Sequence, residues 1–390
     1  MKTGKERLLC GLLTNSEADD CFIEGSMILK EDLDMGTDKV NDGLCNEIEI
    51  KLVRLREYMK SRGLCALLLK RIDNFAWITA GGDNRCVCGA DLGVASVLVT
   101  QDEQWGLTSR VEGRRLREET LAHIGAGNIF RIEEYPWYRE PASVSLALER
   151  VASSDGCVGR VGADFPVAGT EFVGDGLFGL RYPFTETEAH RYTRIAQGIT
   201  EVVERVAEEV RPGQTELSIA GKLSSNLLAA GYYPTVVLVG ADLRAKRYRH
   251  PFPTMNTVDK YCMIIVCANR GGLTAALTRS VYIGPPDSGL RRHHEAAAYV
   301  YAVMNAYTRP GARWVEVMEA MKSEYCAQGF EGEWRHHHQG GPIGYQDREF
   351  LVSPEGTSDR DFSYILPLQA VAWNPSVPGA KSEDSLLVRG

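Results

Sequence analysis

The 390-residue chain lacks a long apolar run, an excess of basic residues and a paired cysteine motif. A membrane-spanning helix needs about 20 apolar residues, so no membrane segment is expected. Lys and Arg number 44 against 52 Asp and Glu, which gives a net charge of -8. Because nucleic-acid binding usually needs a basic surface, we expect no nucleic-acid partner. Cys86 and Cys88 have no second pair at zinc-binding spacing, which argues against a structural zinc site.

The N-terminal residues do not have the pattern of an export signal. Residues 1–15 are too polar for a secretory signal peptide, and their apolar stretch is too short. We therefore expect a cytoplasmic protein whose ten cysteines are reduced thiols. Residues 1–45 mix acidic and polar side chains without a clear period, and we expect them to form an irregular N-terminal arm.

Residues 46–178 alternate between helical and strand patterns, which predicts an α/β domain. The first helix is marked by apolar residues at helical spacing, and Gly63 ends it. These apolar residues are Ile48, Leu52, Leu55 and Met59. Three apolar runs that follow are predicted to be strands, at residues 64–69, 74–80 and 94–100.

Residues 179–390 contain an internal duplication. Arg-Pro-Gly occurs at residues 211–213 and again at 309–311, each time between two helical patterns. In both copies a second glycine follows 18 positions after the glycine of the triplet, at Gly231 and at Gly329. Proline stops one helix and glycine ends the next, so the matched spacing predicts two similar helix pairs.

An apolar hairpin follows each predicted helix pair. The first hairpin is expected over residues 261–266 and 273–283, with a turn at 269–272. The second is expected over residues 368–373 and 381–388, with a turn at 375–379. Two copies of helix, helix and hairpin predict a pseudo-two-fold domain, with a site where the hairpins meet.

This arrangement resembles the superfamily of creatinase, aminopeptidase P and methionine aminopeptidase, which has the pita-bread fold. The resemblance covers about residues 47–388 and is most specific over residues 250–279 and 381–388. It implies an α/β (α+β) protein, with a creatinase-type N-terminal domain over 46–178 and a pita-bread domain over 179–390. It also implies a homodimer.

Metal-dependent members of this superfamily hold two divalent cations with two Asp, one His and two Glu, because bridging cations need several hard anionic ligands. The family motif Gly-Tyr-x-Ser-Asp-Ile-Thr-Arg is matched by Gly-Leu-Thr-Ala-Ala-Leu-Thr-Arg at residues 272–279. The five ligand positions fall on Cys267, Ala276, Gly341, Asn374 and Glu383. Both hairpin pairs, Cys267 with Ala276 and Asn374 with Glu383, are nine residues apart and are expected to face each other. One carboxylate cannot hold two hard cations, so we expect no metal and no other cofactor.

The resemblance implies that His250 and Glu383 are the catalytic residues. His250 lies 17 residues before Cys267 and matches the family histidine that binds substrate and assists proton transfer. In creatinase, a metal-free member, the matching histidine is the general acid/base, a role that suits histidine near neutral pH. Glu383 is expected to bind substrate or act as a general base, with a pKa that rises toward neutrality if burial desolvates it. The alternatives are a loop histidine and a structural glutamate.

Four further residues are predicted to bind substrate: His337, Asn374, Arg348 and Cys267. His337 matches a substrate-binding histidine of related peptidases, Asn374 offers an amide, and Arg348 is suited to a carboxylate. Cys267 is either buried or a nucleophile activated by His250.

The tract at residues 335–341 is expected to be extended, so that His336 and His338 share one face and His337 the other. A mononuclear zinc site of His336, His338 and Glu383 is the alternative interpretation.

The function favoured by these residues is a metal-independent, creatinase-like hydrolase that cleaves a C–N bond of a small polar metabolite. Creatinase has a Glu at the position of Thr278 and uses it for its guanidinium substrate, so creatine itself is not expected. One alternative is a catalytically inactive binding module of the same fold. The other is an Xaa-Pro aminopeptidase or dipeptidase with an unorthodox metal site.

Overall fold

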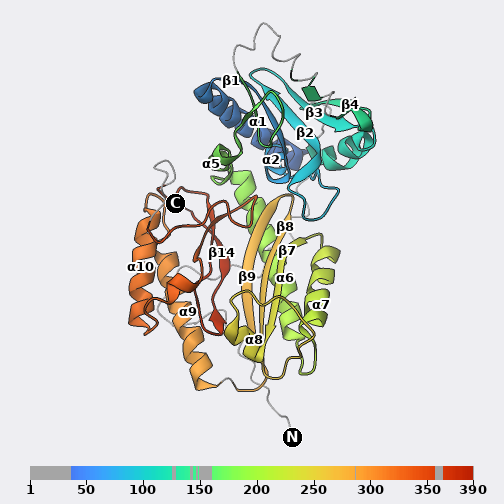
Figure 1. The fold of residues 1–390 in the computed structure, drawn as a ribbon. Coiled ribbons are helices and arrows are strands. Elements are labelled where there is room, and N and C mark those ends of the chain that lie inside the picture. Colours follow the sequence, from blue (N-terminus) through green and yellow to red (C-terminus); the bar gives the residue numbers. More distant parts are fainter. Residues whose placement is uncertain are drawn as a thin grey trace.

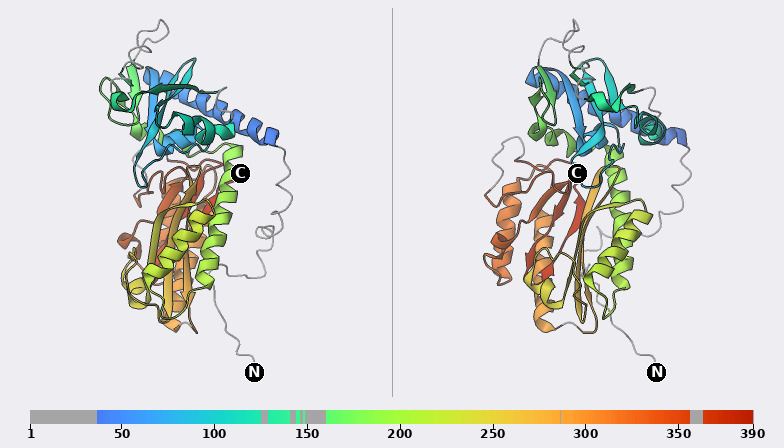
Figure 2. Two further views of the ribbon diagram at one scale, coloured as in Figure 1. Left: turned by 90° about the vertical axis from the view of Figure 1, so that its right-hand side faces the viewer. Right: turned by 45° about the vertical axis from the view of Figure 1, so that its right-hand side comes forward.

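The structure, a computed structural model, describes residues 37–124, 129–140, 144–145, 148, 160–285, 287–355 and 363–389. Two parts follow each other along the chain (Figure 1). We call residues 37–181 the N-terminal part and residues 186–389 the C-terminal part. The N-terminal part lies at one end of the C-terminal part in all three ribbon views (Figures 1 and 2). The domain limits inferred from the sequence stay predictions.

The N-terminal part is one mixed sheet with helices beside it. The sheet has the order β4-β3-β2-β1-β5-β6. Its strands are β1 (Leu64–Arg71), β2 (Leu92–Thr100), β3 (Gln104–Ser109), β4 (Arg131–Tyr135), β5 (Arg160–Ala163) and β6 (Glu171–Phe172). The main helices are α1 (Thr37–Arg62), α2 (Ile72–Ile78) and α5 (Phe178–Arg181), with short helical turns α3 (Gly113–Arg115) and η2 (Leu116–Thr120) between β3 and β4. β1 and β2 confirm two of the predicted strands.

Two sequence predictions for this part are wrong in detail. Helix α1 begins at Thr37, so residues 37–45 are helical and not part of an irregular arm, whereas residues 1–36 lie outside the described residues. The run predicted as a strand at 74–80 lies mostly in helix α2. Its apolar side chains are buried together with Asp73 and Asn74. A short run that is buried on every side has no period with which to distinguish a helix from a strand.

Cysteine chemistry also differs from the expectation in one place. Cys65 is disulfide-bonded, so the prediction of ten reduced thiols is wrong for this residue. Cysteine pairing depends on how closely the fold brings two Cα atoms together, which spacing in the sequence does not reveal. Within the described ranges, no helix is both long and apolar enough to cross a membrane.

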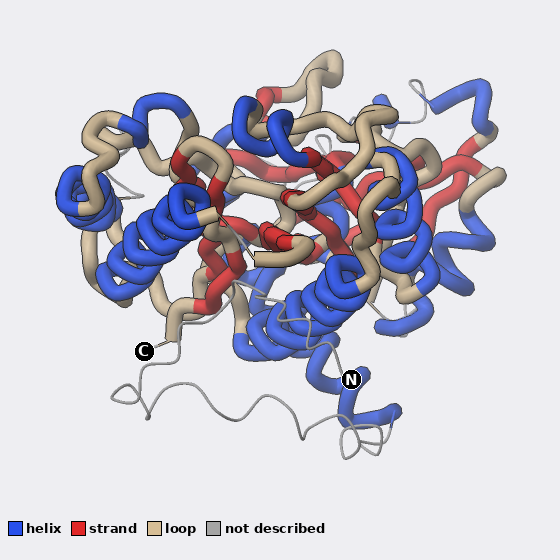
Figure 3. Tube along the Cα trace, turned by 90° about the horizontal axis from the view of Figure 1, so that it is seen from below, coloured by secondary structure: helices blue, strands red, loops and turns tan. Residues whose placement is uncertain are grey.

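The C-terminal part consists of two similar units whose strands lie between two sets of helices (Figure 3). The first unit contains α6 (Glu186–Glu208), α7 (Glu216–Ala229), β7 (Tyr233–Ala241), α8 (Asp242–Arg247), β8 (Tyr261–Arg270) and β9 (Leu273–Tyr282). The second contains α9 (Ser288–Tyr307), α10 (Trp314–Ala327), β10 (Gly340–Ile343), β11 (Ala370–Trp373), β12 (Ser376–Val377), β13 (Ala380–Lys381) and β14 (Asp384–Leu387). The three-stranded sheets have the orders β7-β8-β9 and β10-β11-β14.

The backbone supports the predicted duplication. The glycines of the two Arg-Pro-Gly triplets, Gly213 and Gly311, have φ of 85° and 81°. Gly231 and Gly329, which follow the second helix of each pair, have φ of 79° and 78°. Left-handed backbone favours glycine, so both copies use the same residue for the same turn. The sequence prediction missed β7 and β10, the third strand of each sheet.

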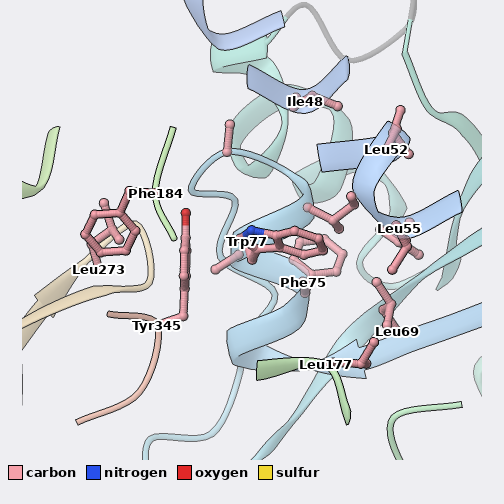
Figure 4. Close-up of a cluster of buried hydrophobic side chains, with 14 of the residues drawn as sticks. Ile48, Leu52, Leu55, Leu69, Phe75, Trp77, Leu177, Phe184, Leu273 and Tyr345 are labelled. Atoms are coloured by element: carbon pink, nitrogen blue, oxygen red, sulfur yellow. The ribbon is translucent and has the colours of Figure 1, made fainter. Parts of the chain in front are cut away.

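One hydrophobic core runs through both parts of the chain (Figure 4). In the close-up, Trp77 and Phe75 of α2 lie on one side of Tyr345, and Phe184 and Leu273 lie on its other side. All five side chains belong to a single buried cluster. The N-terminal part is therefore packed firmly against the hairpins that carry the candidate site.

A buried ionic network lies within this core. Lys51 Nζ is 2.6 Å from Glu47 Oε1 and 2.7 Å from Glu188 Oε1, and none of the three side chains is exposed to solvent. The same ammonium donates to Trp77 O at 2.6 Å and to the Tyr345 hydroxyl at 3.1 Å. The network joins α1, α2 and α6, so an ammonium from the N-terminal part neutralises a carboxylate of the C-terminal part.

We predict that Lys51→Met lowers the free energy of unfolding by about 3–5 kcal/mol, because buried Glu188 loses its ammonium and Glu47 keeps only Arg191. Arg114→Met is the matched control. Its ion pair with Glu118 is largely exposed, so its loss should cost less than about 1 kcal/mol. Urea denaturation followed by circular dichroism measures both. Equal losses in the two variants would contradict a structural role for the network.

Candidate functional site

The first hairpin places Cys267 directly opposite Ala276. The pair belongs to the antiparallel ladder of β8 and β9, which confirms the predicted facing. Gly271 and Gly272 form the turn with φ of 56° and 79°, and a two-residue turn with positive φ at both positions strongly favours glycine. Cys267 and Ala276 are both buried in the core that joins the two parts.

The second hairpin carries Asn374 and Glu383. The ladder of β11 and β14 ends with Trp373 opposite Asp384, and Asn374 and Glu383 are the next residues beyond that pair. Both are buried. The two hairpins meet here, because Thr278 N donates to Glu383 O at 2.9 Å.

Protein cations surround the Glu383 carboxylate. Arg348 Nη2 donates to Oε1 at 2.8 Å, and Thr278 Oγ1 donates to Oε2 at 2.7 Å. Lys381 Nζ lies 3.5 Å from Oε2, and its side chain is also buried. Two positive charges of the chain itself therefore face the one carboxylate that remains at the inherited ligand positions.

The residues at these positions do not fit a pair of divalent cations. They offer one carboxylate, one amide and one thiol, while Ala276 and Gly341 offer no ligand atom. Both oxygens of Glu383 already accept hydrogen bonds, and a metal ion there would lie beside Arg348 and Lys381. Hard cations need several anionic oxygens, so these positions do not fit the two metal ions of the metal-dependent relatives.

The pKa of Glu383 does not shift in the direction that the sequence predicts. Burial alone would raise its pKa, but the charges of Lys381 and Arg348 and the Thr278 hydrogen bond outweigh burial, so the pKa of Glu383 is lowered. The prediction of a pKa rising toward neutrality is wrong, because the sequence did not show that Lys381 and Arg348 lie beside Glu383. Glu383 is ionised at neutral pH and orients the two cations.

Cys267 is a buried thiol. Burial, with a smaller contribution from Asp347, raises the pKa of the Cys267 thiol far above its ordinary value. A thiol held neutral is a poor nucleophile. Its place in the hydrophobic core favours the interpretation as a packing residue over that as a nucleophile.

Three histidines gather beside the carboxylate site. His337 Nε2 lies 3.1 Å from His250 Nε2, and the rings of His337 and His338 stack with centroids 4.3 Å apart. The expectation that His337 points away from its neighbours is wrong: the tract is not one extended strand. Residues Glu333–His336 form a short 3-10 helix, and His336 does not belong to the cluster.

All three imidazoles have lowered pKa values. The first cause is burial, which is only partial for the solvent-accessible His250 and deeper for His337 and His338, and the positive charge of Lys381 adds to it. The pKa of His338 falls to about 4, and those of His250 and His337 also fall below the ordinary value. Neutral imidazole has one N–H and one lone pair, so in the contact between His250 and His337 one Nε2 donates and the other accepts.

Several polar atoms around the site are buried without a hydrogen-bond partner among the described residues. They are Asn374 Oδ1, Arg348 Nε, Arg249 Nη1 and His337 Nδ1. Buried polar groups nearly always have partners in native proteins. Among the described residues, none supplies a partner for these four atoms.

The segment 345–349 fixes the position of Arg348. Tyr345 donates to Glu188 Oε1 at 2.6 Å, and Gln346 donates to Asp73. Arg181 Nη2 donates to Glu349 Oε2 at 2.6 Å.

The residue next to Arg348 on its other side is also held. Asp347 accepts from Thr235 Oγ1 at 2.8 Å. Each side chain around Arg348 is thus tied to another element, and two of these ties reach the N-terminal part.

The sequence analysis missed Lys381, Thr278 and the anchors of Arg348 as site residues. Lys381 lies within the predicted second hairpin, but a buried lysine has no sequence signature of its own. Thr278 was noted only as a difference from creatinase. The structure brings His250, His337, Arg348 and Glu383 near one another, and Asn374 N donates to Gln339 O beside them; the roles of these residues stay predictions.

Comparisons with known proteins agree with this architecture. Residues 191–388, just over half of the chain, match Metallopeptidase family M24. No curated protein matches the chain.

Three solved structures illustrate the likeness in fold. The prolidase from Pyrococcus horikoshii OT3 is 18% identical with a TM-score of 0.70, and the match covers 87% of this chain and 95% of that one. The Xaa-Pro dipeptidase from Bacillus anthracis is 16% identical with a TM-score of 0.69 over the same shares. The N-terminal domain of the FACT complex subunit SPT16 from chickpea is 12% identical with a TM-score of 0.64, covering 88% and 94%. The chain therefore belongs to metallopeptidase family M24 and has the α/β pita-bread fold that its sequence predicts.

Proposed function

We propose that the chain is a metal-independent hydrolase that cleaves a C–N bond of a small polar metabolite, with His250 as general acid/base. The observation that supports this most is that side-chain cations of the protein stand where relatives of the superfamily hold metal ions. Glu383 is paired there with Arg348 and Lys381. His250 and His337 are hydrogen-bonded beside this pair. A proton-transfer group and a charged binding site therefore adjoin each other.

The proposed chemistry moves one proton through His250. Neutral His250 takes a proton from water as the water oxygen attacks the carbon of the C–N bond. Histidinium then gives this proton to the leaving nitrogen as the bond breaks, which restores the neutral ring. Because Nε2 is engaged with His337, Nδ1 is the nitrogen that exchanges the proton, and His337 orients the ring.

The groups around Glu383 suit a substrate that carries a carboxylate. Arg348 and Lys381 lie beside Glu383, and Arg348 also lies beside the Asp347 carboxylate. Arg249 is separately paired with Glu333. The open N–H of Arg348 suits a substrate carboxylate, and Asn374 offers an open carbonyl oxygen for a substrate N–H.

The first test concerns metal. After dialysis against Mn²⁺ and gel filtration without chelator, we expect well under one equivalent of Mn²⁺ in the protein, because manganese needs oxygen ligands that the site lacks. Elemental analysis measures the content. Two equivalents would contradict the argument from lost ligands and restore the metallopeptidase interpretation.

The second test removes the proposed acid/base. Wild-type protein is screened against N-acyl, N-carbamoyl and N-amidino amino acids and Xaa-Pro dipeptides, with release of the amine as the signal. On any substrate found, His250→Ala should lower kcat by about 10²–10⁴-fold, whereas the exposed His190→Ala should leave it unchanged.

The outcomes of this screen separate the alternatives. Cleavage of Xaa-Pro dipeptides that EDTA abolishes would favour a peptidase. Full activity in His250→Ala would exclude the proposed mechanism. A chain without turnover on the whole panel would favour the binding module, for which the likeness to the SPT16 domain gives a precedent in fold.

The third test uses pH. Lys381 is one of the groups that lower the pKa of His250, after burial. The rate kcat/KM should therefore fall on acidification through a pKa below the ordinary histidine value of about 6.5. Lys381→Met removes a positive charge, raises the pKa of His250 and moves the acid limb to higher pH. Lys322→Met, whose pair with Glu319 lies outside the site, should not move it. An unchanged limb in Lys381→Met would show that another group controls the rate.

A further inference from the structure

The three histidines form a cluster outside the inherited ligand positions. One ring nitrogen from each of His250, His337 and His338 lies within 4.8 Å of the others. We propose that these residues form a mononuclear site for a transition-metal cation of the zinc type. The proposed ligands come from the loop after α8 and from the tract after the short helix at Glu333–His336.

The separation of the nitrogens suits such an ion. With Zn–N bonds of about 2.0–2.1 Å, a tetrahedral ion holds two ligand nitrogens roughly 3.3 Å apart. His250 Nε2 and His337 Nε2 are 3.1 Å apart, so an ion could replace the proton between them with little movement. The His338 ring stacks on His337 at 4.3 Å. Because the three nitrogens lie within 4.8 Å of one another, the third needs a shift of at most about 1.5 Å to reach the same separation.

The ligand type selects the metal. Three imidazoles without a carboxylate suit Zn²⁺, Ni²⁺ or Cu²⁺ and not Mg²⁺, Ca²⁺ or Mn²⁺. Three protein ligands leave the fourth position to water. His250 is exposed to solvent, which gives the ion a path of entry.

The backbone that carries the ligands is fixed. Gln339 Nε2 donates to His337 O at 2.6 Å, and the Arg249 side chain, next to His250, is held by Glu333. The basic neighbours Lys381 and Arg348 are themselves paired with Glu383, which reduces their repulsion of a cation. Binding is expected to be weaker than at a structural zinc site that has thiolate ligands.

The site has a consequence for catalysis, and this second step rests on the proposed function. An ion bound to His250 Nε2 takes the place of the proton there, and the neutral ring then carries its N–H at Nδ1, which leaves Nδ1 no lone pair to take a proton from water. Zn²⁺ should therefore inhibit the hydrolase, in contrast to an enzyme that depends on zinc for turnover.

The binding test uses the full-length chain after removal of metal with chelator and gel filtration. Titration with ZnCl₂ by calorimetry should give one equivalent, and Co²⁺ should give the visible absorption of a tetrahedral complex. His338→Gln should weaken Zn²⁺ binding about tenfold or more. His336→Gln is the matched control, because His336 neighbours the cluster but contributes no atom to it. Thermal unfolding confirms that both variants are folded.

Equal affinity in His338→Gln and wild-type protein, or a loss confined to His336→Gln, would overturn the proposed ligand set. Absence of Zn²⁺ binding in wild-type protein would overturn the site itself. These readouts need no substrate, so they stand even if the hydrolase proposal fails. Conversely, turnover that depends on His250 but is insensitive to Zn²⁺ would overturn the inference and leave the proposed function intact.

Discussion

A carboxylate removed from water must be neutralised within contact distance, and this requirement organises the chain. In the core, Lys51 and Arg191 neutralise Glu47 and Glu188. At the junction of the two parts, Arg181 neutralises Glu349. In the candidate site, Arg348 and Lys381 neutralise Glu383. An uncompensated buried charge costs several kcal/mol, so each carboxylate holds its cation, and each pair holds the two elements that carry it.

The segment 345–349 links these pairs. Its tyrosine joins the Lys51 network, its glutamate joins Arg181, and its arginine faces Glu383. The N-terminal part therefore helps to position Arg348 in the site, although it supplies no residue to the site that we describe. A change at α1 or α5 would act on the site through this segment.

Much of the fold could be predicted from local patterns. The helix pairs and hairpins of the C-terminal part follow from proline, glycine and apolar periodicity, and the facing of Cys267 and Ala276 follows from hairpin register. Helix α2 could not be assigned, because a run buried on every side has no period.

The candidate site was harder to predict than the fold. Most of its residues were identified through the superfamily resemblance, but their charge states depend on neighbours distant in sequence. Lys381, two residues before Glu383, and Arg348, 35 residues before it, together reverse the expected shift of the Glu383 pKa. The stacking of His337 on His338 depends on where a short helix ends, and helix ends are the least predictable feature of a sequence.

The apolar packing of Cys267 and Ala276 restricts the mutational paths open to the chain. Restoring aspartate at either position would insert an anion into a core that has closed around a thiol and a methyl group, and the cations nearby are already committed to Glu383. No single substitution rebuilds a dinuclear centre, and each first step would cost stability before any metal could offset it. The packing of Cys267 and Ala276 in one hairpin thus makes a return to the metal ligands of the metal-dependent relatives costly in stability.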